Sequence, residues 1–487
     1  MRSAETGHEG VSREPEAGGE SVSTDRFDWV VIGSGPGGYV AAIRAAQLGQ
    51  RVAIVEEDRP GGVCLNWGCI PSKALLTGAE LVENVRSHGE TFGLRTGGLE
   101  LDYSKAVDHS RKTADRLCKG VQGLLKKNQI ELVAGRGRVA GPHSVEVSEP
   151  AGRVLEAERI LVATGSTEWV PPGLEVDGEM VLTSREALEK RDVPERLVVI
   201  GAGAVGIEFA YVYAMYGAQV TIVEMLDQMI PGADPDVAQV LQREFRRKGI
   251  EVRLGTRFEK LERGATGLGV AISSDKGHEE LQADRVLAAI GRRPRSANLG
   301  LEEAGVVLDE RGFVQVDEQL RSQVPSIGAI GDVAGGALLA HKASEEGIAA
   351  VEFAAGLTRP PLHPDRIPAC IYAQPQVAWV GLSEAAARER YGKDLKVGKF
   401  PFTASGKALA GAHSAGFAKI LAEPEYGAIV GAHVVGVGAT ELIAEIGLAL
   451  TLEATTDEVM ATCHAHPTLS EAILEATLAA EGRAINF

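Results

Sequence analysis

The chain has 487 residues, of which 44% are hydrophobic and 24% are charged, and it carries a formal net charge of −17. This length exceeds what one hydrophobic core usually serves and indicates about three domains. The acidic balance argues against nucleic acid and anionic membranes as partners, because both attract basic surfaces. The five cysteines are sparse and odd in number, unlike a secreted disulfide framework, and no apolar leader stands at the start. We therefore expect a cytoplasmic protein in reducing surroundings.

Residues 1–26 are polar and rich in Gly, Ser and Glu. They cannot bury enough apolar surface to order themselves, so we expect a disordered tail. Two later stretches, 197–223 and 428–452, are largely apolar. The first contains Glu208 and the second contains two glutamates, so both are interpreted as buried elements of a protein without a membrane span.

The first structured pattern begins with an apolar run at 28–32, which is suited to a buried parallel strand. The sequence GSGPGG follows at 33–38, then a helical run and a second strand that ends on an acid. This order is a Rossmann fingerprint, in which glycines let the backbone approach a pyrophosphate and the acid binds a ribose hydroxyl. The candidate ligands are Gly33, Gly35, Gly38 and Glu56.

Two cysteines, Cys64 and Cys69, stand five residues apart in a glycine-flanked stretch at 61–73. In an ideal helix their Cα atoms would lie roughly 8–9 Å apart, whereas a disulfide needs about 4.4–6.8 Å. The turn must depart from regular helix, and Gly68 supplies the backbone freedom. A helix is expected from about Ser72, and its N-terminus favours a thiolate at Cys69. The pattern is typical of a reactive redox pair; two unlinked thiols or half of a zinc site are the alternatives.

The dinucleotide pattern occurs a second time. A strand at 196–200 leads into GAGAVG at 201–206, and the next strand ends on an acid at the same interval as before. Such a repeat predicts two dinucleotide sites on one chain. Glu208 lies in the apolar helix that follows and needs a partner, because isolated buried charge is costly. The candidate ligands of this second site are Gly201, Gly203, Gly206 and Glu224.

Four further elements are expected around the second fingerprint. A long helix at 103–127 has Lys and Arg residues that are interpreted as a solvated face. A strand at 160–163 closes the first domain, a helix with a serine cap begins at Ser184, and a strand at 285–290 ends the second domain. The residues after the two strand ends that are candidates for nucleotide binding are Thr164, Gly165 and Gly291.

The last part of the chain follows a linker at 360–368 that contains four prolines, and it alternates short β runs with helices. His466 is followed five residues later by Glu471, and the two could form a hydrogen-bonded base and its orienting group. Two other interpretations stay open. Cys463, His464 and His466 could ligate a metal, or the histidines could simply lie at the surface.

Together, the cysteine stretch, the two fingerprints and the sequence HPTLSE at 466–471 resemble the flavin-dependent pyridine nucleotide–disulfide oxidoreductases, most closely their dihydrolipoamide dehydrogenase branch. Trp67 departs from that family, which usually has a smaller residue there. The resemblance covers the chain from Phe27 onward and implies the α/β fold class with two Rossmann-like domains. The implied parts are an FAD-binding domain at 27–165, an NAD-binding domain at 166–289, a return segment of the FAD domain at 290–363 and an α+β dimerisation domain at 364–487.

The resemblance also implies roles for individual residues, with FAD and NAD as cofactors and no metal. Cys64 would exchange disulfides with substrate, and Cys69 would lie beside the flavin. Lys73 would pair with Glu208 near the reactive flavin nitrogen. Asp332, otherwise a strand-end aspartate in a turn, would hold the ribitol, and a helix from His341 would pass near the flavin. The catalytic base and its orienter would be His466 and Glu471.

The implied reaction is oxidation of protein-bound dihydrolipoamide with reduction of NAD⁺, by a homodimer that serves a lipoylated carrier protein. Three alternatives are weighed against it. A mercuric reductase would favour a C-terminal cysteine pair, which residues 482–487 lack, and a glutathione-type reductase would favour basic residues at 225–227, which are absent. A flavoprotein scaffold subunit would favour loss of Cys64 or Cys69, and both are present.

Overall fold

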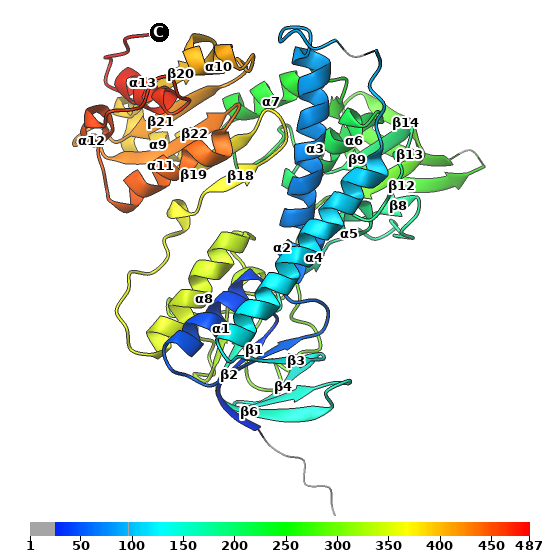
Figure 1. Cartoon of the computed structure of the whole chain (residues 1–487), viewed down its shortest axis with the longest axis vertical. Helices are drawn as coiled ribbons and strands as arrows, with labels where there is room; N and C mark the ends of the chain where they lie inside the picture. Colours follow the sequence, from blue (N-terminus) through cyan, green and yellow to red (C-terminus); the bar gives the residue numbers. More distant parts are fainter. Residues whose placement is uncertain (1–24, 96, 266) are drawn as a thin grey trace, which may run out of the picture.

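The structure is a computed structural model that describes residues 25–95, 97–265 and 267–487. Figure 1 shows three units: a blue and cyan N-terminal sheet at the bottom, a green unit at the upper right, and an orange and red C-terminal unit at the upper left. The predicted tail lies outside the described residues up to position 24. Asp25 and Arg26, which were assigned to that tail, instead belong to the first strand, where they pair with Leu155 and Glu156.

The first unit is built on a seven-stranded sheet of order β3-β2-β1-β6-β5-β4, with β17 added beside β6. β17 comes from the return segment and pairs in parallel with β6, so two distant stretches of chain share this sheet. The strands are β1 (Asp25–Ile32), β2 (Val52–Glu56), β3 (Glu131–Ala134), β4 (Gly137–Gly141), β5 (Ser144–Val147), β6 (Arg153–Val162) and β17 (Ile327–Ala329).

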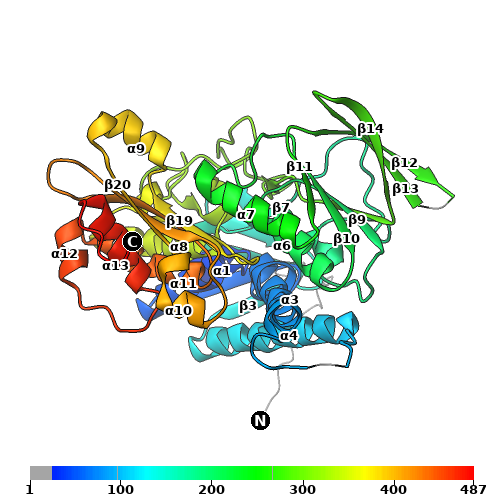
Figure 2. The ribbon, with the colours of Figure 1, turned by 90° about the horizontal axis from the view of Figure 1, so that it is seen from above.

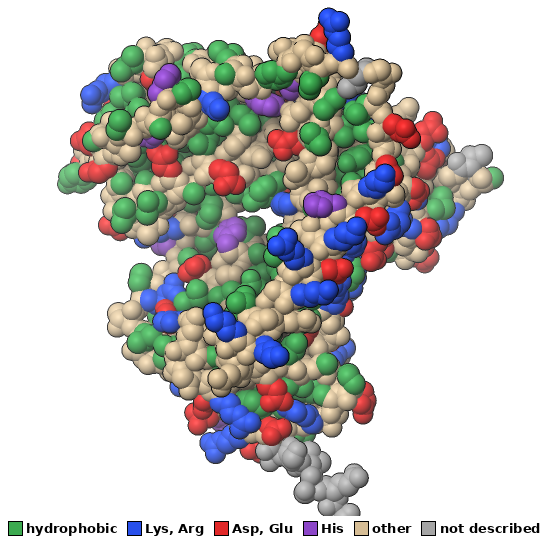
Figure 3. Space-filling model, viewed as in Figure 1, with side chains coloured by type: hydrophobic (Ala, Val, Ile, Leu, Met, Phe, Trp, Pro, Cys, Tyr) green, Lys and Arg blue, Asp and Glu red, His purple; other side chains and the backbone are tan. Residues whose placement is uncertain are grey.

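Helices cover this sheet and extend from it. α1 packs closely on α8. A Cβ on Gly347 would lie only 2.6 Å from the carbonyl oxygen of Gly37, so the two helices can approach this closely only with glycine at position 347. α3 and α4 run side by side along the molecule (Figures 1 and 2). Lys112, Arg116 and Lys119 on α4 are exposed, and Figure 3 shows Lys and Arg along this helix, so the predicted solvated face is confirmed. The elements are α1 (Pro36–Gln47), α2 (Gly62–Trp67), α3 (Cys69–His88), α4 (Tyr103–Lys127), the 3₁₀ turn η1 (Gly331–Ala334) and α8 (Ala340–Ala354).

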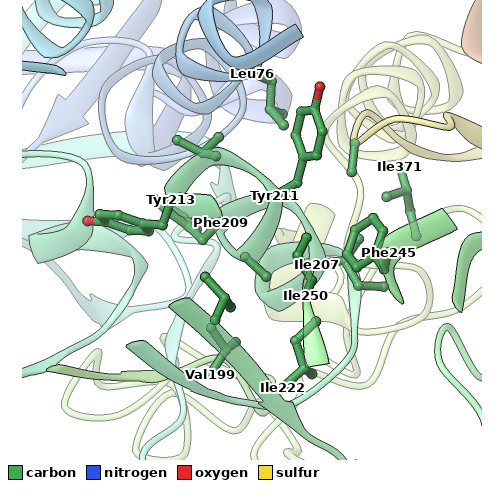
Figure 4. Close-up of a cluster of buried hydrophobic side chains, with 14 of the residues drawn as sticks. Leu76, Val199, Ile207, Phe209, Tyr211, Tyr213, Ile222, Phe245, Ile250 and Ile371 are labelled. Atoms are coloured by element: carbon green, nitrogen blue, oxygen red, sulfur yellow. The ribbon is translucent and has the colours of Figure 1, made fainter. Parts of the chain in front are cut away.

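The second unit has a parallel sheet of order β11-β10-β9-β15-β8 and a three-stranded antiparallel sheet β12-β13-β14. Figure 4 shows Ile207 of the apolar helix α6 in the buried cluster that also contains Val199 of β9 and Ile222 of β10, and it shows Tyr211 of the same helix next to Leu76 of α3. Thr183, not Ser184, caps α5, because its side chain and Glu186 complete a capping box. The elements are β8 (Val181–Leu182), α5 (Ser184–Ala187), β9 (Arg196–Ile200), α6 (Ala204–Met215), β10 (Gln219–Val223), α7 (Pro235–Arg247), β11 (Glu251–Arg253), β12 (Arg257–Gly264), β13 (Gly267–Ser274), β14 (Gly277–Ala283) and β15 (Arg285–Ala288).

The chain passes from the first unit to the second and later back again, and the two connecting segments pair as a two-stranded ribbon of β7 (Ser166–Glu168) and β16 (Arg292–Pro294). The C-terminal unit is an antiparallel sheet of order β18-β19-β22-β21-β20 with five α-helices and three short 3₁₀ turns. None of the helices that the structure describes is long and apolar enough to cross a membrane. The elements are η2 (Pro364–Arg366), β18 (Ala369–Ile371), β19 (Val377–Gly381), α9 (Glu384–Tyr391), η3 (Gly392–Asp394), β20 (Lys396–Pro401), η4 (Phe402–Ala404), α10 (Gly406–Ala410), β21 (Phe417–Ala422), β22 (Ile429–Val435), α11 (Ala439–Thr451), α12 (Thr456–Ala461) and α13 (Glu471–Ala480).

Candidate active site

A cavity of about 1130 Å³ lies where the three units meet. Its lining combines the first fingerprint, the cysteine stretch, η1, α6 and parts of β18 and α11, so the chain must fold completely to build it. The predicted site residues that line it are Gly33, Gly35, Glu56, Cys64, Cys69, Lys73, Thr164, Gly165, Glu208 and Asp332. The other predicted residues lie outside its lining.

The first fingerprint has the backbone of a phosphate cradle. Gly33 has φ +100°, and a Cβ on Gly38 would lie 1.9 Å from the carbonyl oxygen of Gly33, so α1 can approach β1 only with glycine there. A Cβ on Gly35 would meet nothing within 4 Å, because that side opens on the cavity. A pyrophosphate at the start of α1 fits this arrangement.

The acids at the ends of β2 and β10 are held in the same way. Glu56 accepts hydrogen bonds from the backbone N–H (2.9 Å) and hydroxyl (2.6 Å) of Ser34. Glu224 accepts one from the backbone N–H of Ala202 at 2.7 Å and another from that of Leu226 at 2.9 Å. Each carboxylate therefore ties its glycine loop to the end of the next strand.

The cysteine pair lies at a break between two helices. α2 ends at Trp67, Gly68 adopts φ −152° and ψ −114°, and α3 begins at Cys69. The departure from regular helix that the spacing predicted is therefore present. Trp67 itself lines the cavity, donates a hydrogen bond from Nε1 to Asp58 at 2.8 Å, and lies under the guanidinium of Arg185 at 4.0 Å.

The two thiols have unequal acidity. A hydrogen bond from Cys64 and the nearby Lys73 ammonium lower the pKa of Cys69 to about 7. The same hydrogen bond, together with burial, raises the pKa of Cys64. In the reduced pair Cys69 is therefore about half ionised near pH 7 and becomes the thiolate above it, whereas Cys64 keeps its proton.

The charged pair next to the thiols is also in place. Lys73 Nζ lies 3.0 and 2.9 Å from the two carboxylate oxygens of Glu208, which is buried. The backbone N–H of Tyr372 donates to Glu208 at 3.1 Å, and the Tyr372 ring lies 4.5 Å from the Lys73 ammonium. The predicted partner of Glu208 is thus Lys73, and the ring of Tyr372 covers the cation.

A third thiol, Cys370, lines the same cavity. Burial raises its pKa to about 11, so it stays protonated at neutral pH and is a poor nucleophile. Neither Cys370 nor Tyr372 belongs to a motif, and the sequence carries no signal that brings β18 to the redox pair.

Asp332 sits in η1 at the end of β17 and accepts a hydrogen bond from the Ser166 hydroxyl. Arg292 Nε donates to the same hydroxyl at 2.7 Å. Ser166 and Arg292 come from β7 and β16. The ribbon between the units therefore fixes one carboxylate oxygen of Asp332, the residue predicted to bind the ribitol. Both residues were missed, because only the folded chain brings them to Asp332.

His466 and Glu471 form the predicted pair, with Nδ1 and Oε1 2.8 Å apart, and Glu471 also accepts from the backbone N–H of Thr468. These contacts lower the pKa of Glu471, and the hydrogen bond from the Thr468 backbone has the largest effect. The His466 side chain is 79% exposed and lies outside the lining of the cysteine cavity. His464 has a different partner: its Nε2 lies 2.7 Å from a carboxylate oxygen of Glu445. Within the described ranges, no three potential metal ligands are grouped to hold an ion.

Comparison with known proteins places the chain among flavin-linked redox enzymes. The family described as "Pyridine nucleotide-disulphide oxidoreductase" matches residues 27–347, and the dimerisation domain of that family matches residues 367–477. The chain therefore belongs to the pyridine nucleotide-disulphide oxidoreductase family, and the resemblance, the fold class and the enzyme class predicted from the sequence are confirmed.

Several similar curated proteins are dihydrolipoyl dehydrogenases. The chain is 44% identical over 467 residues to the dihydrolipoyl dehydrogenase of Zymomonas mobilis, covering 95% of this chain and 100% of that protein. It is 42% identical to that of Bacillus subtilis, covering 95% and 99%. Among solved structures, LpdA from Mycobacterium tuberculosis superposes with a TM-score of 0.87 at 28% identity, covering 93% of this chain and 99% of that one.

Proposed function

We propose that the chain is a dihydrolipoyl dehydrogenase, which oxidises protein-bound dihydrolipoamide and reduces NAD⁺. The observation that carries this proposal is the Cys64–Cys69 pair, which lies beside Lys73 and opens on the same cavity as the first dinucleotide cradle. Curated relatives with that name, matched over 99–100% of their own length, support it.

The cavity and its cradle fit FAD, whose pyrophosphate would meet Gly35 and the start of α1, with Asp332 on the ribitol. Bound FAD would supply the chemistry that reoxidises the dithiol, by accepting its two electrons and releasing them as hydride to NAD⁺. NAD⁺ would take the second cradle at the start of α6. In this proposal FAD is held by 27–165 and 290–363, NAD⁺ by 166–289, and dimer contacts come from 364–487.

The protein's own residues carry the thiol chemistry. A substrate thiolate attacks the Sγ of Cys64 in the Cys64–Cys69 disulfide, and Cys69 leaves as the thiolate that its pKa favours. The second substrate thiol then attacks the substrate sulfur bound to Cys64, which closes the lipoyl disulfide and returns Cys64 as a thiol. One substrate dithiol is oxidised and one enzyme disulfide reduced.

The base for this chemistry is His466 of the second subunit of a homodimer, held in orientation by Glu471. Substrate thiols have pKa values of about 8.5, so at neutral pH a base is needed to remove the proton of the attacking thiol. In one chain His466 lies outside the cavity of the cysteines, and Figure 1 shows α13, which begins at Glu471, well away from α2. The partner would be a lipoylated carrier, and the compartment the cytoplasm.

The test compares substrates side by side on the purified holoenzyme. Lipoamide, oxidised glutathione and Hg²⁺ are offered with NADH and with NADPH, and Cys64→Ser serves as the control for chemistry at the pair. Turnover of lipoamide with NADH that Cys64→Ser abolishes supports the proposal. Preference for glutathione with NADPH, or for Hg²⁺, would assign one of the reductase alternatives instead.

A further inference from the structure

The turn that carries Asp332 is held at both ends by one ion pair from α8. The backbone N–H of Gly331, where η1 begins, donates to Glu346 Oε2 at 2.7 Å. Lys342 Nζ donates to the carbonyl oxygen of Gly335, just after η1 ends, at 2.8 Å. Lys342 and Glu346 are 2.8 Å apart and one helical turn apart, so both face η1 together.

Both side chains are buried, with 6% of Lys342 and 8% of Glu346 exposed. A buried ion pair pays a desolvation cost that often cancels its attraction, and apolar residues of similar volume are commonly as stable or more so. Stability alone is therefore a weak reason for this pair. What an apolar pair cannot supply is the two directional hydrogen bonds to the ends of η1.

The geometry leaves few other roles for these two residues. Asp332 lines the cavity, as do the neighbours His341 and Ala343, whereas Lys342 and Glu346 do not. They therefore act on the cavity only through the turn. One Asp332 oxygen is already fixed by Ser166, so the position of the other depends on where the two ends of η1 are held.

We propose that the Lys342–Glu346 pair is a positioning device that holds Asp332 where its carboxylate binds the ribitol hydroxyls of FAD. The inference rests on the proposed function, in which Asp332 is a ligand of FAD. Lys342 and Glu346 are positioning residues, because they reach FAD only through η1.

The experiment separates positioning from folding with a double variant. Lys342→Met and Glu346→Leu are made singly and together, and each protein is purified as holoenzyme. Two quantities are measured: thermal stability of the stripped protein, and the rate of FAD release from the holoenzyme, followed by flavin fluorescence. Each single variant strands a buried group and should lower stability. The double variant should regain stability, yet still release FAD about tenfold faster or more, because both hydrogen bonds to η1 are gone.

Conservative and matched variants complete the test. Glu346→Gln keeps an acceptor for Gly331 and should release FAD within about twofold of the parent. Glu352→Gln is the control on the same helix, since Glu352 pairs with Arg44 at 2.7 Å and lies away from η1; it should change stability and leave FAD release alone. If FAD retention recovers with stability in the double variant, the pair is only structural and the inference is wrong.

Asp332→Asn separates this inference from the proposal on which it rests. If Asp332→Asn releases FAD quickly and the double variant does not, the positioning role fails and the ligand assignment stands. If Asp332→Asn holds FAD as tightly as the parent, the assignment of Asp332 itself fails, and the positioning role falls with it.

Discussion

Gly38 and Gly206 stand at the same place in two copies of one pattern. An added Cβ would lie 1.9 Å from the carbonyl oxygen of Gly33 in the first copy and 2.0 Å from that of Gly201 in the second. Gly33 and Gly201 have φ angles of +100° and +106°. The backbone of the two cradles is therefore nearly the same, and the difference between the sites lies in their surroundings.

The first cradle opens on a cavity shared by all three units, and α8 packs tightly over its helix. The glycines of the second cradle lie outside that cavity. Glu56 is partly buried and accepts a hydrogen bond from the hydroxyl of Ser34, whereas Glu224 is buried and is held by the backbone N–H groups of Ala202 and Leu226. Enclosure suits a permanently held group, and a cradle outside that cavity suits a nucleotide that exchanges at every turnover.

The largest effect is expected from breaking each cradle separately. Gly38→Ala should lose bound flavin and at least about 10²-fold of all turnover, because the new Cβ displaces α1 from β1. Gly206→Ala should stay yellow, and dihydrolipoamide should still reduce its cysteine pair, while the KM for NAD⁺ rises about tenfold or more. Flavin content, anaerobic reduction by dihydrolipoamide and steady-state kinetics measure these outcomes. Equal loss of flavin in both variants would contradict the assignment of the two sites.

A second prediction separates the thiol side of the reaction from the nucleotide side. His466→Ala should lose about 10²–10⁴-fold of lipoamide turnover, the usual worth of a general base. Reduction of bound flavin by NADH should change far less, because that step does not require the substrate thiol to be deprotonated. Stopped-flow measurement of both half-reactions tests this.

The crossed arrangement has its own control. A Cys64→Ser/Cys69→Ser chain and a His466→Ala chain should each have little or no lipoamide activity, and a mixed dimer contains one complete site if His466 serves the other subunit. Activity in isolated mixed dimers supports catalysis across the interface. Mixed dimers no more active than their parents would show that His466 acts within its own chain or not at all.

Local features were the ones that could be predicted from the sequence. The predicted helix at 103–127 has the observed bounds of α4, and the break at Gly68 falls where the cysteine spacing requires it. The fingerprints share this property, because glycine spacing dictates their backbone directly. Lys73 and Glu208 were paired only through the family resemblance, since they come from different units.

What could not be predicted depends on contacts between distant segments. β1 includes Asp25 and Arg26 because they pair with β6, and polar residues in a strand give no hydrophobic signal. Ser166 reaches Asp332, and Tyr372 reaches Glu208, only after the return segment and β18 have docked. Such pairs are specified by tertiary packing, for which a single sequence has no periodic pattern.

A third prediction concerns the acid of each cradle. NAD⁺ should be preferred over NADP⁺ by at least about tenfold, because Glu224 would bond the ribose 2′-hydroxyl and repel a 2′-phosphate; a charged hydrogen bond is worth about 1.5–3 kcal/mol. Glu224→Gln should narrow the ratio of kcat/KM values. Glu56→Gln is the matched control and should weaken flavin retention without changing that ratio. A parent enzyme that uses both nucleotides equally would contradict the role of Glu224.

The smallest effect is expected from the thiols between the two sites. When the pair is reduced by two electrons, the Cys69 thiolate beside oxidised flavin should give a long-wavelength absorbance. The pKa of Cys69 is lowered to about 7, so this band should be full well above pH 7 and fade as the pH falls through 7 and the thiolate takes up a proton. Lys73→Met should move the midpoint upward by about one unit or more, because it removes a cation and leaves the Glu208 charge uncompensated. Cys370→Ser is the control: its thiol has a pKa of about 11, so the band and its midpoint should not change. A midpoint that follows Cys370, or a band independent of pH from 5 to 9, would assign the thiolate to another group.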